Sequence, residues 1–287
     1  MADNTGWLTF EQTRKIRSLS LDKAELRKLL DRLEERSLAA GEREARRFVP
    51  RPDMTPEQAD NARQQIRDGH KLRVRVEGED GRRLDGSIRE VFESPNFPDG
   101  VRTALFDSSM PLRVIHNYAV ANTVKVYLDF SRPAVLDFTL LPSFETPNAS
   151  EFSVNGEDAT WVNGVAHEFD DFMRTQPSAA GWLHRHSVYD ALVWPFAFPM
   201  GIWFAYRLSG RIERIPSPFI RAGLYVFVTY LSLVAFRVMF HYARWIWPRI
   251  EFRHPRDRAL RHRLAWGTLV VAVACSAAWD LLKWLAR

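Results

Sequence analysis

Three long apolar stretches occupy the last hundred residues of this chain and constrain its fold more than any other feature. They cover about residues 188–208, 222–242 and 264–285. A helix needs ~20 apolar residues to cross a hydrocarbon core of ~30 Å, and each stretch is close to that length. The sequence therefore predicts an α-helical transmembrane domain over 181–287, with three spans, behind a folded N-terminal part.

The distribution of charge and tryptophan supports this division. Residues 1–187 hold 26 Lys and Arg against 30 Asp and Glu, whereas residues 188–287 hold 14 against 5. The basic excess thus belongs to the apolar half and argues against a nucleic-acid partner. Eight of the ten tryptophans follow residue 180, as expected where indole rings lie at the headgroup level.

The N-terminus and the cysteine content predict a cytoplasmic domain. Residues 1–10 lack a basic segment followed by an apolar one, so we expect no cleaved signal peptide. Cys275 is the single cysteine and falls in the third apolar stretch, which excludes a disulfide framework. We therefore expect residues 1–187 to remain in a reducing cytoplasm.

Arginines between the apolar stretches predict the orientation in the membrane. The connection 209–221 carries three arginines, and the connection 243–263 carries seven. Positively charged loops stay on the cytoplasmic side, so 243–263 is predicted inside, in contact with anionic headgroups. Three spans then place the N-terminal domain in the cytoplasm and the C-terminus outside the plasma membrane.

The first apolar stretch leaves an alternative open. Pro195, Pro199 and Gly201 interrupt it, and proline removes a backbone donor and crowds the preceding turn. A kinked or re-entrant first segment would leave two full spans instead of three.

Residues 1–52 are expected to form an N-terminal helical segment that ends in a proline-containing linker. Thr9 with Gln12 resembles a capping box for a short helix, and Ser20 is a candidate cap for a second one. That second helix carries apolar residues at helical spacing, namely Leu26, Leu29, Leu30 and Leu33. We expect this face to pack on its own domain; a coiled coil in a homo-oligomer is the alternative.

Residues 53–180 are expected to form an α+β domain that begins with a well-marked helix. Thr55 is a candidate cap, Pro56 suits the first helical position and Gln58 completes the box. We expect this helix to end at Gly69 in the left-handed conformation. Alternating residues 72–77 then predict a strand, and Asp80-Gly81 predicts a turn into a second strand over 84–92.

The rest of the domain alternates in the same way. Residues 124–129 predict a strand, and 158–175 predict a helix with its aromatic residues on one stripe. Weaker strand patterns cover 101–106, 112–118 and 152–154, and proline-rich loops are expected at 94–98 and 141–147. Together these elements predict an antiparallel sheet or sandwich with flanking helices.

No catalytic pattern is present, so the sequence predicts neither an enzyme, nor a cofactor, nor a metal site. It contains no phosphate-binding glycine loop, no GxSxG and no HExxH. A carboxylate pair among Asp107, Asp129 and Asp137 is the one enzymatic alternative that we carry forward. The acidic set Glu168, Asp170 and Asp171 is expected to be a solvated helix face, because successive helical residues diverge.

Four charges within the apolar stretches are the candidate functional residues: Asp190, Arg237, Asp280 and Lys283. An ionisable group in hydrocarbon is costly and usually faces a partner or water. In the predicted topology Asp190 and Arg237 lie at similar depth, so we expect them to pair. The alternative is that all four reach the interface.

A second set is predicted to anchor the protein at the membrane surface: His184, Arg185, His186, Arg244, Trp245, Trp247, Arg249 and Arg253. The function predicted is a membrane-anchored sensor or adaptor whose cytosolic domain binds an unidentified ligand or protein. The alternative is a membrane-perturbing effector or pore subunit controlled by that domain. Both rest on architecture, which is a weak argument for function.

Overall fold

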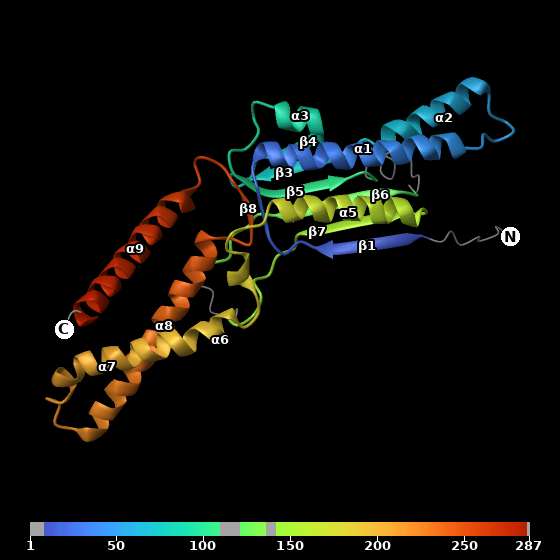
Figure 1. The fold of residues 1–287 in the computed structure, drawn as a ribbon. Coiled ribbons are helices and arrows are strands. Elements are labelled where there is room, and N and C mark those ends of the chain that lie inside the picture. The colour runs from blue at the N-terminus through green and yellow to red at the C-terminus, as the bar shows by residue number, and fades with distance from the viewer. Residues whose placement is uncertain (1–8, 110–120, 136–141, 286–287) are drawn as a thin grey trace. The chain divides into compact units, whose positions relative to one another are not determined.

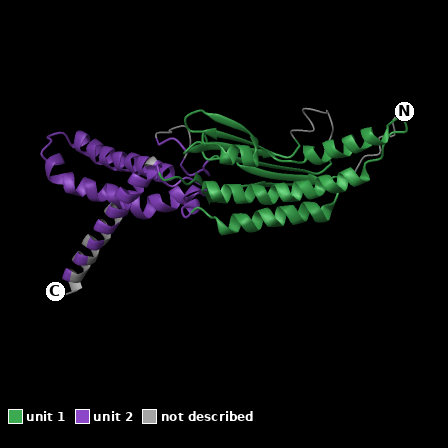
Figure 2. Cartoon of the chain, turned by 90° about the horizontal axis from the view of Figure 1, so that it is seen from above, with its two compact units in different colours: residues 1–131, 147–178, 250–255 green, residues 132–146, 179–249, 256–287 purple. Residues whose placement is uncertain are grey.

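The computed structural model describes residues 9–109, 121–135 and 142–285, and its contacts group the chain into two compact units (Figure 2). Unit 1 consists of residues 1–131, 147–178 and 250–255. Unit 2 consists of residues 132–146, 179–249 and 256–287. Each unit is thus built from segments that are distant in sequence.

Unit 1 is an α+β fold around a six-stranded antiparallel sheet of order β1-β7-β6-β5-β3-β4 (Figure 1). Its strands are β1 (Phe10–Lys15), β3 (Arg73–Gly78), β4 (Arg83–Ser87), β5 (Val101–Asp107), β6 (Thr123–Asp129) and β7 (Glu151–Gly156). Its helices are α1 (Lys23–Arg47), α2 (Pro56–Gly69), α3 (Ile88–Glu93) and α5 (Ala159–Thr175). The expected antiparallel sheet with flanking helices is confirmed.

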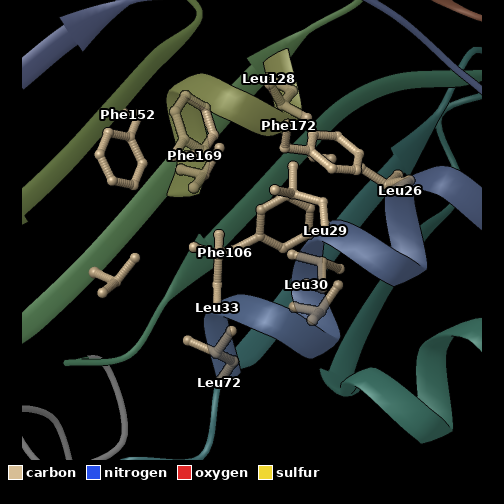
Figure 3. Close-up of a cluster of buried hydrophobic side chains, with 14 of the residues drawn as sticks. Leu26, Leu29, Leu30, Leu33, Leu72, Phe106, Leu128, Phe152, Phe169 and Phe172 are labelled. Atoms are coloured by element: carbon tan, nitrogen blue, oxygen red, sulfur yellow. The ribbon is translucent and has the colours of Figure 1, made fainter. Parts of the chain in front are cut away.

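One face of the sheet carries the hydrophobic core. Val74 pairs with Phe106, and Val126 pairs with Phe152, so the buried residues of successive strands lie side by side. From α1 and α5, apolar side chains pack onto them: Leu26, Leu29, Leu30, Leu33, Phe169 and Phe172 (Figure 3). Phe152 and Phe169 stack with their ring centroids 4.0 Å apart. The leucine stripe therefore packs on its own domain, as expected.

A short parallel pair of strands completes unit 1. β2 (Leu19–Leu21) pairs with β8 (Ile250–Phe252), and both outer residues of each strand are buried. The ring of Phe252 contacts that of Phe130 edge-on, with centroids 5.7 Å apart. A segment of the arginine-rich connection 243–263 is therefore part of the core of unit 1, which the sequence did not predict.

Two expectations for the N-terminal segment are wrong. Thr9 and Gln12 do not cap a helix, because residues 10–15 form strand β1 at the edge of the sheet. Ser20 lies within β2, and α1 is capped instead by Asp22, which accepts from the backbone N–H of Glu25. The Glu25 side chain accepts in return from the Asp22 N–H, which closes a capping box.

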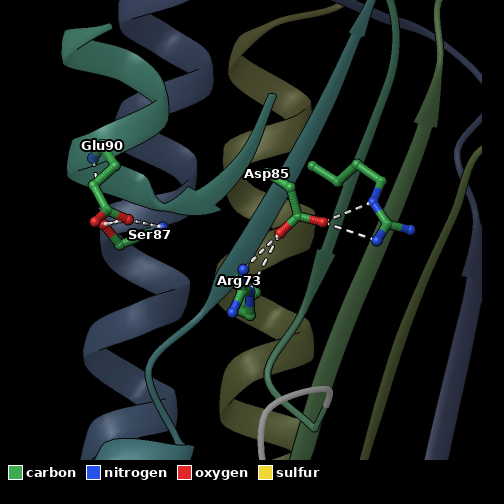
Figure 4. Close-up of polar contacts among 5 residues, drawn as sticks. Arg73, Asp85, Ser87 and Glu90 are labelled. Carbon is green, nitrogen blue, oxygen red and sulfur yellow. Dashed lines mark hydrogen bonds and ion pairs between the residues drawn. The ribbon is translucent and has the colours of Figure 1, made fainter. Parts of the chain in front are cut away.

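The predictions for the α+β domain are mostly confirmed. The Thr55 box, the strand from Arg73, the Asp80-Gly81 turn and helix α5 are all present, and Gly81 has φ +80°. The second strand ends early, at Ser87, because Ser87 caps α3 in a box with Glu90 (Figure 4). Gly69 is helical and not left-handed. The expected strand 112–118 lies outside the described residues.

The secondary structure of the described part of unit 2 is helical. It contains a 3₁₀ turn η1 (Gly181–His184), then α6 (Val188–Leu192), a π-helical turn η2 (Val193–Ala197), α7 (Phe198–Ile212), α8 (Pro218–Ile246) and α9 (Arg258–Leu285). α6, η2 and α7 form one helical run, so the prolines widen the helix at Val193–Ala197 without ending it. Pro199 lies inside this run, just after the π-helical turn, where its missing N–H removes a backbone hydrogen bond.

α7 and α8 pack against each other through small residues. A Cβ on Gly201 would lie 3.2 Å from the Thr229 methyl and 3.4 Å from the Ser232 Cβ, so any side chain there would have to push α8 away by a few tenths of an ångström. Two helices of the described residues are long and apolar enough to cross a membrane: residues 188–212 and 218–246. Few of their residues are buried within the chain.

Candidate functional site

The second face of the sheet in unit 1 is polar and carries the candidate binding site. Along β3, Arg73, Arg75 and Glu77 alternate with buried Val74 and Val76. β5 and β6 continue this face with Thr103 and Leu105, and with Lys125, Tyr127 and Asp129. An antiparallel sheet with helices on one side commonly leaves the other side solvated.

This face is hollowed over strands β4, β3, β5 and β6. The hollow has a volume of about 370 Å³ and is lined by Arg75, Glu77, Arg83, Arg102, Thr103, Leu105, Tyr127, Asp129 and Ser131. A second hollow of about 330 Å³ lies beside it and shares Leu105 and Tyr127. Leu105 and Tyr127 thus form a ridge between two polar depressions.

Several charges on this face neutralise one another across strands. The Asp85 carboxylate accepts from the guanidinium groups of both Arg73 and Arg75, at 3.0 and 2.8 Å (Figure 4). These bonds outweigh partial burial, which alone would raise the pKa of Asp85, and hold that pKa below its usual value. Arg102 pairs more loosely with Glu77, at 3.5 Å. Cross-strand pairs of this kind stabilise a sheet by a few tenths of a kcal/mol each.

Other polar groups of the first hollow have no such partner. Arg83 forms no ion pair, and the Tyr127 and Thr103 hydroxyls form no hydrogen bond, with any of the residues that the structure describes. Partial burial, together with the carboxylates of Asp129 and Glu77, raises the pKa of Tyr127, so its hydroxyl keeps its proton at neutral pH. The hollow therefore presents free hydrogen-bond donors beside a cation.

The carboxylates proposed for acid–base chemistry are not brought together. Asp107 lies opposite Lys125 and Asp129 opposite Thr103, so the two are four residues apart along neighbouring strands, roughly 13 Å. Asp107 accepts from the N–H and hydroxyl of Ser109, at 2.8 and 2.6 Å, and Asp129 accepts from Ser131. Asp137 lies outside the described residues. Within the described residues no cluster of three potential metal ligands occurs.

A second polar cluster lies in unit 2, at the base of its helices. The His184 side chain is buried, its Nε2 lies 2.7 Å from the Trp247 carbonyl and its Nδ1 lies 2.9 Å from the Thr146 hydroxyl. A carbonyl only accepts, so Nε2 carries the proton and Nδ1 accepts from Thr146. Burial, aided by the charges of Arg244 and Arg249, lowers the pKa of His184 to about 4 although the Trp247 carbonyl opposes the shift. The ring is therefore neutral at physiological pH.

Arg244 belongs to the same cluster. Its guanidinium donates to the carbonyls of Leu183 and Phe144, at 3.1 and 3.2 Å, and lies 4.6 Å from the Phe240 ring centroid. Arg249 pairs with Glu145 at 2.6 Å. The cluster thus ties the 144–146 segment and the turn before α6 to the end of α8.

The predicted surface anchors fall into two groups. Arg185 and His186 are exposed, and Trp245 and Trp247 are partly exposed, as an interfacial position requires. His184, Arg244, Arg249 and Arg253 instead have protein partners, which for Arg253 is the Glu25 carboxylate in unit 1. Their binding to headgroups stays a prediction.

The charges within the apolar stretches have the following positions. The Asp190 carboxylate accepts from the Ser143 hydroxyl at 2.6 Å, and its pairing with Arg237 stays a prediction. Tyr189, next to Asp190, packs on Phe236 and Phe240, which flank Arg237 in sequence. The Lys283 ammonium lies 5.3 Å from the Trp279 ring centroid. The Asp280 side chain lies outside the described part of the structure.

Sequence reasoning missed Arg83 and the hollow. The alternation in 72–77 and 124–129 correctly assigned which side chains face outward. It could not show that β5 separates β3 from β6, and this order assembles the hollow. Comparison of the chain with protein-family models, with curated proteins and with solved structures finds no match.

Proposed function

We propose that this chain is a membrane-anchored sensor or adaptor. In this proposal the polar face of the sheet in unit 1 binds a ligand or partner, and the helices of unit 2 hold the protein in the membrane. The main support for the proposal is strand β2, which contacts the chain both where it leaves unit 1 for the helices of unit 2 and where it returns.

The two long helices have an apolar surface that suits contact with lipid. Large apolar side chains are exposed along them, including Trp194, Phe196, Ile202, Trp203, Phe219, Val226, Phe227 and Tyr230. A protein in water rarely exposes so large an apolar area, whereas hydrocarbon accommodates it. A run of 25 residues spans about 37 Å as a helix, which is enough to cross the bilayer.

The chain leaves unit 1 and re-enters it beside the same strand, β2. The Ser20 N–H donates to the Gln176 carbonyl at 3.0 Å, just before the chain passes into unit 2. β8 pairs with the same strand just after α8. A folded unit lies on one side of a membrane, so these contacts support two crossings between residues 178 and 250.

The arginines indicate the orientation of the chain in the membrane. The seven arginines of the 243–263 connection favour the cytoplasmic side of the membrane for this connection. Unit 1 then lies on the same side, because the connection contributes β8 to it. We propose that α9 forms a third crossing, with the C-terminus outside. Exposed Arg261 remains to bind anionic headgroups, because Arg244, Arg249, Arg253 and Arg263 contact protein acceptors.

A sensor must transmit the binding of a ligand at the sheet to the membrane helices. β2 lies directly before α1, and its partners are the exit segment at Gln176 and the return strand β8. A shift of α1 against the sheet would thus act on both connections to the membrane helices. Limited proteolysis of the 213–217 connection in proteoliposomes tests this coupling, since its cleavage rate should change when unit 1 is occupied.

A pore-forming or membrane-perturbing role is the second candidate, and the π-helical turn at Val193–Ala197 favours it. Such turns are rare and often mark functional sites, because the wide turn leaves a carbonyl without its usual partner. Induced expression separates the two candidates. A pore depolarises cells and releases potassium, whereas an anchored adaptor leaves the membrane potential unchanged.

A further inference from the structure

The first hollow on the sheet combines a cation and hydroxyl donors that the described protein does not use. Arg83 comes from the edge strand β4, Thr103 from β5 and Tyr127 from β6. Among the described residues none of these three side chains has a hydrogen-bond acceptor. Arg75 contributes two N–H groups to Asp85, and Arg102 contributes one to Glu77. A guanidinium has five donors, so both retain further N–H groups.

We propose that this hollow binds a small ligand through an oxyanion, either a phosphate or a carboxylate group, held by Arg83 with Arg75 and the hydroxyls of Tyr127 and Thr103. This inference rests on the proposed function, because it names the ligand of the same sheet face. Planar guanidinium groups bind carboxylate and phosphate oxygens through paired, charge-assisted hydrogen bonds. Leu105 and the Tyr127 ring, on the ridge beside the hollow, supply an apolar surface for the rest of the ligand.

The surrounding charges set the size and sign of the ligand. Glu77 and Asp129 also line the hollow and repel a large polyanion, while the single charge of Asp85 balances only one of Arg73 and Arg75. Four guanidinium groups, those of Arg73, Arg75, Arg83 and Arg102, thus face three carboxylates, and Arg83 is the one that forms no ion pair with the described residues. A volume of about 370 Å³ accommodates a metabolite-sized molecule with one oxyanion group.

Calorimetric titration of the full chain in detergent tests the inference, with inorganic phosphate and malonate as the two probes in separate arms. Arg82→Gln is the matched control, because Arg82 neighbours Arg83 but pairs with Asp80 at 2.6 Å and does not line the hollow. We expect at least one probe to bind saturably. Arg83→Gln should weaken it about tenfold or more, Tyr127→Phe should weaken it less, and Arg82→Gln should leave it unchanged.

The arm that binds identifies the group, phosphate or carboxylate. The inference is overturned if neither probe binds saturably, or if Arg83→Gln and Arg82→Gln have equal effects. Arg83 is exposed, so the variant should fold, and an unchanged melting temperature verifies this. If the anion binds as expected but does not alter cleavage of the 213–217 connection, the sensor proposal fails while the site stands.

Discussion

The backbone N–H of Ser20 donates to the carbonyl of Gln176 at 3.0 Å, which brings the start of α1 beside the point where the chain leaves unit 1. Leu19 and Leu21, on either side of Ser20, pair with Ile250 and Phe252, where the chain returns. Three segments, each more than 70 residues from the next in sequence, therefore meet at the short strand β2. The stability of unit 1 should depend on residues that follow the second apolar helix.

Phe252→Ala tests this dependence. Phe252 is buried and packs on Phe130, so its truncation leaves a cavity and should lower the free energy of unfolding of unit 1 by about 3–5 kcal/mol. Urea unfolding of the full chain in detergent measures it. Phe227→Ala is the control, because Phe227 is exposed on α8 and its loss should leave unit 1 unchanged. Equal effects of both variants would contradict the role of β8.

The sequence predicted those elements that local patterns determine, and missed those that depend on distant pairing. The capping box at Thr55 and the leucine stripe of α1 are local, and both were found. β1 has almost no buried side chain, so it lacks the alternation of a strand, and Thr9 with Gln12 resembled a helix cap. β8 has three residues within an arginine-rich connection, and only its partner β2 defines it as a strand.

The candidate site was predictable only in part, for the same reason. Outward-facing residues follow from alternation along each strand. Their assembly into a hollow depends on strand order, which a single strand's pattern does not contain. The cluster around His184 likewise depends on the fold, because Thr146, His184 and Trp247 lie far apart in sequence.

His184 should make stability depend on pH. Its pKa is lowered to about 4 from 6.5, so below pH 6.5 the unfolded chain binds a proton that the folded chain does not. Stability from this group is complete above pH 6.5 and falls as the pH drops to about 4, by roughly 3 kcal/mol. His184→Gln should flatten part of the slope of unfolding free energy measured from pH 7 to pH 4.5. His70, whose pKa burial also lowers to about 4, should account for a remaining part. An unchanged slope in His184→Gln would contradict the buried neutral ring.

The contact of α7 with α8 should require glycine at position 201. Gly201→Leu places a side chain against Thr229 and Ser232, so the helices must separate, and the pair should become sensitive to trypsin in detergent. Gly210→Leu is the matched control, since no atom lies within 4 Å of a Cβ there. If both variants resist trypsin like the parent, the close packing is not needed.

Asp190 and Ser143 should be energetically coupled. The hydrogen bond of 2.6 Å to a carboxylate is worth about 1.5–3 kcal/mol where water is scarce. In a double-mutant cycle of Ser143→Ala and Asp190→Asn, the combined loss of folded protein should be smaller than the two single losses added. Strict additivity would exclude the bond.

An Arg237→Gln arm, with the Asp190→Arg/Arg237→Asp exchange, separately tests the predicted ion pair, since the exchange should recover what each single change loses.

Cysteine accessibility tests the central claim, that unit 1 and the return strand share the cytoplasmic side of a membrane crossed twice between them. In a Cys275→Ser background, single cysteines replace Asn96 in unit 1, Pro216 between α7 and α8, and Pro255 after β8, all three exposed. An impermeant maleimide applied to intact cells should label position 216 only. Positions 96 and 255 should react after permeabilisation. Labelling of position 255 from outside, or protection of position 216, would contradict the account.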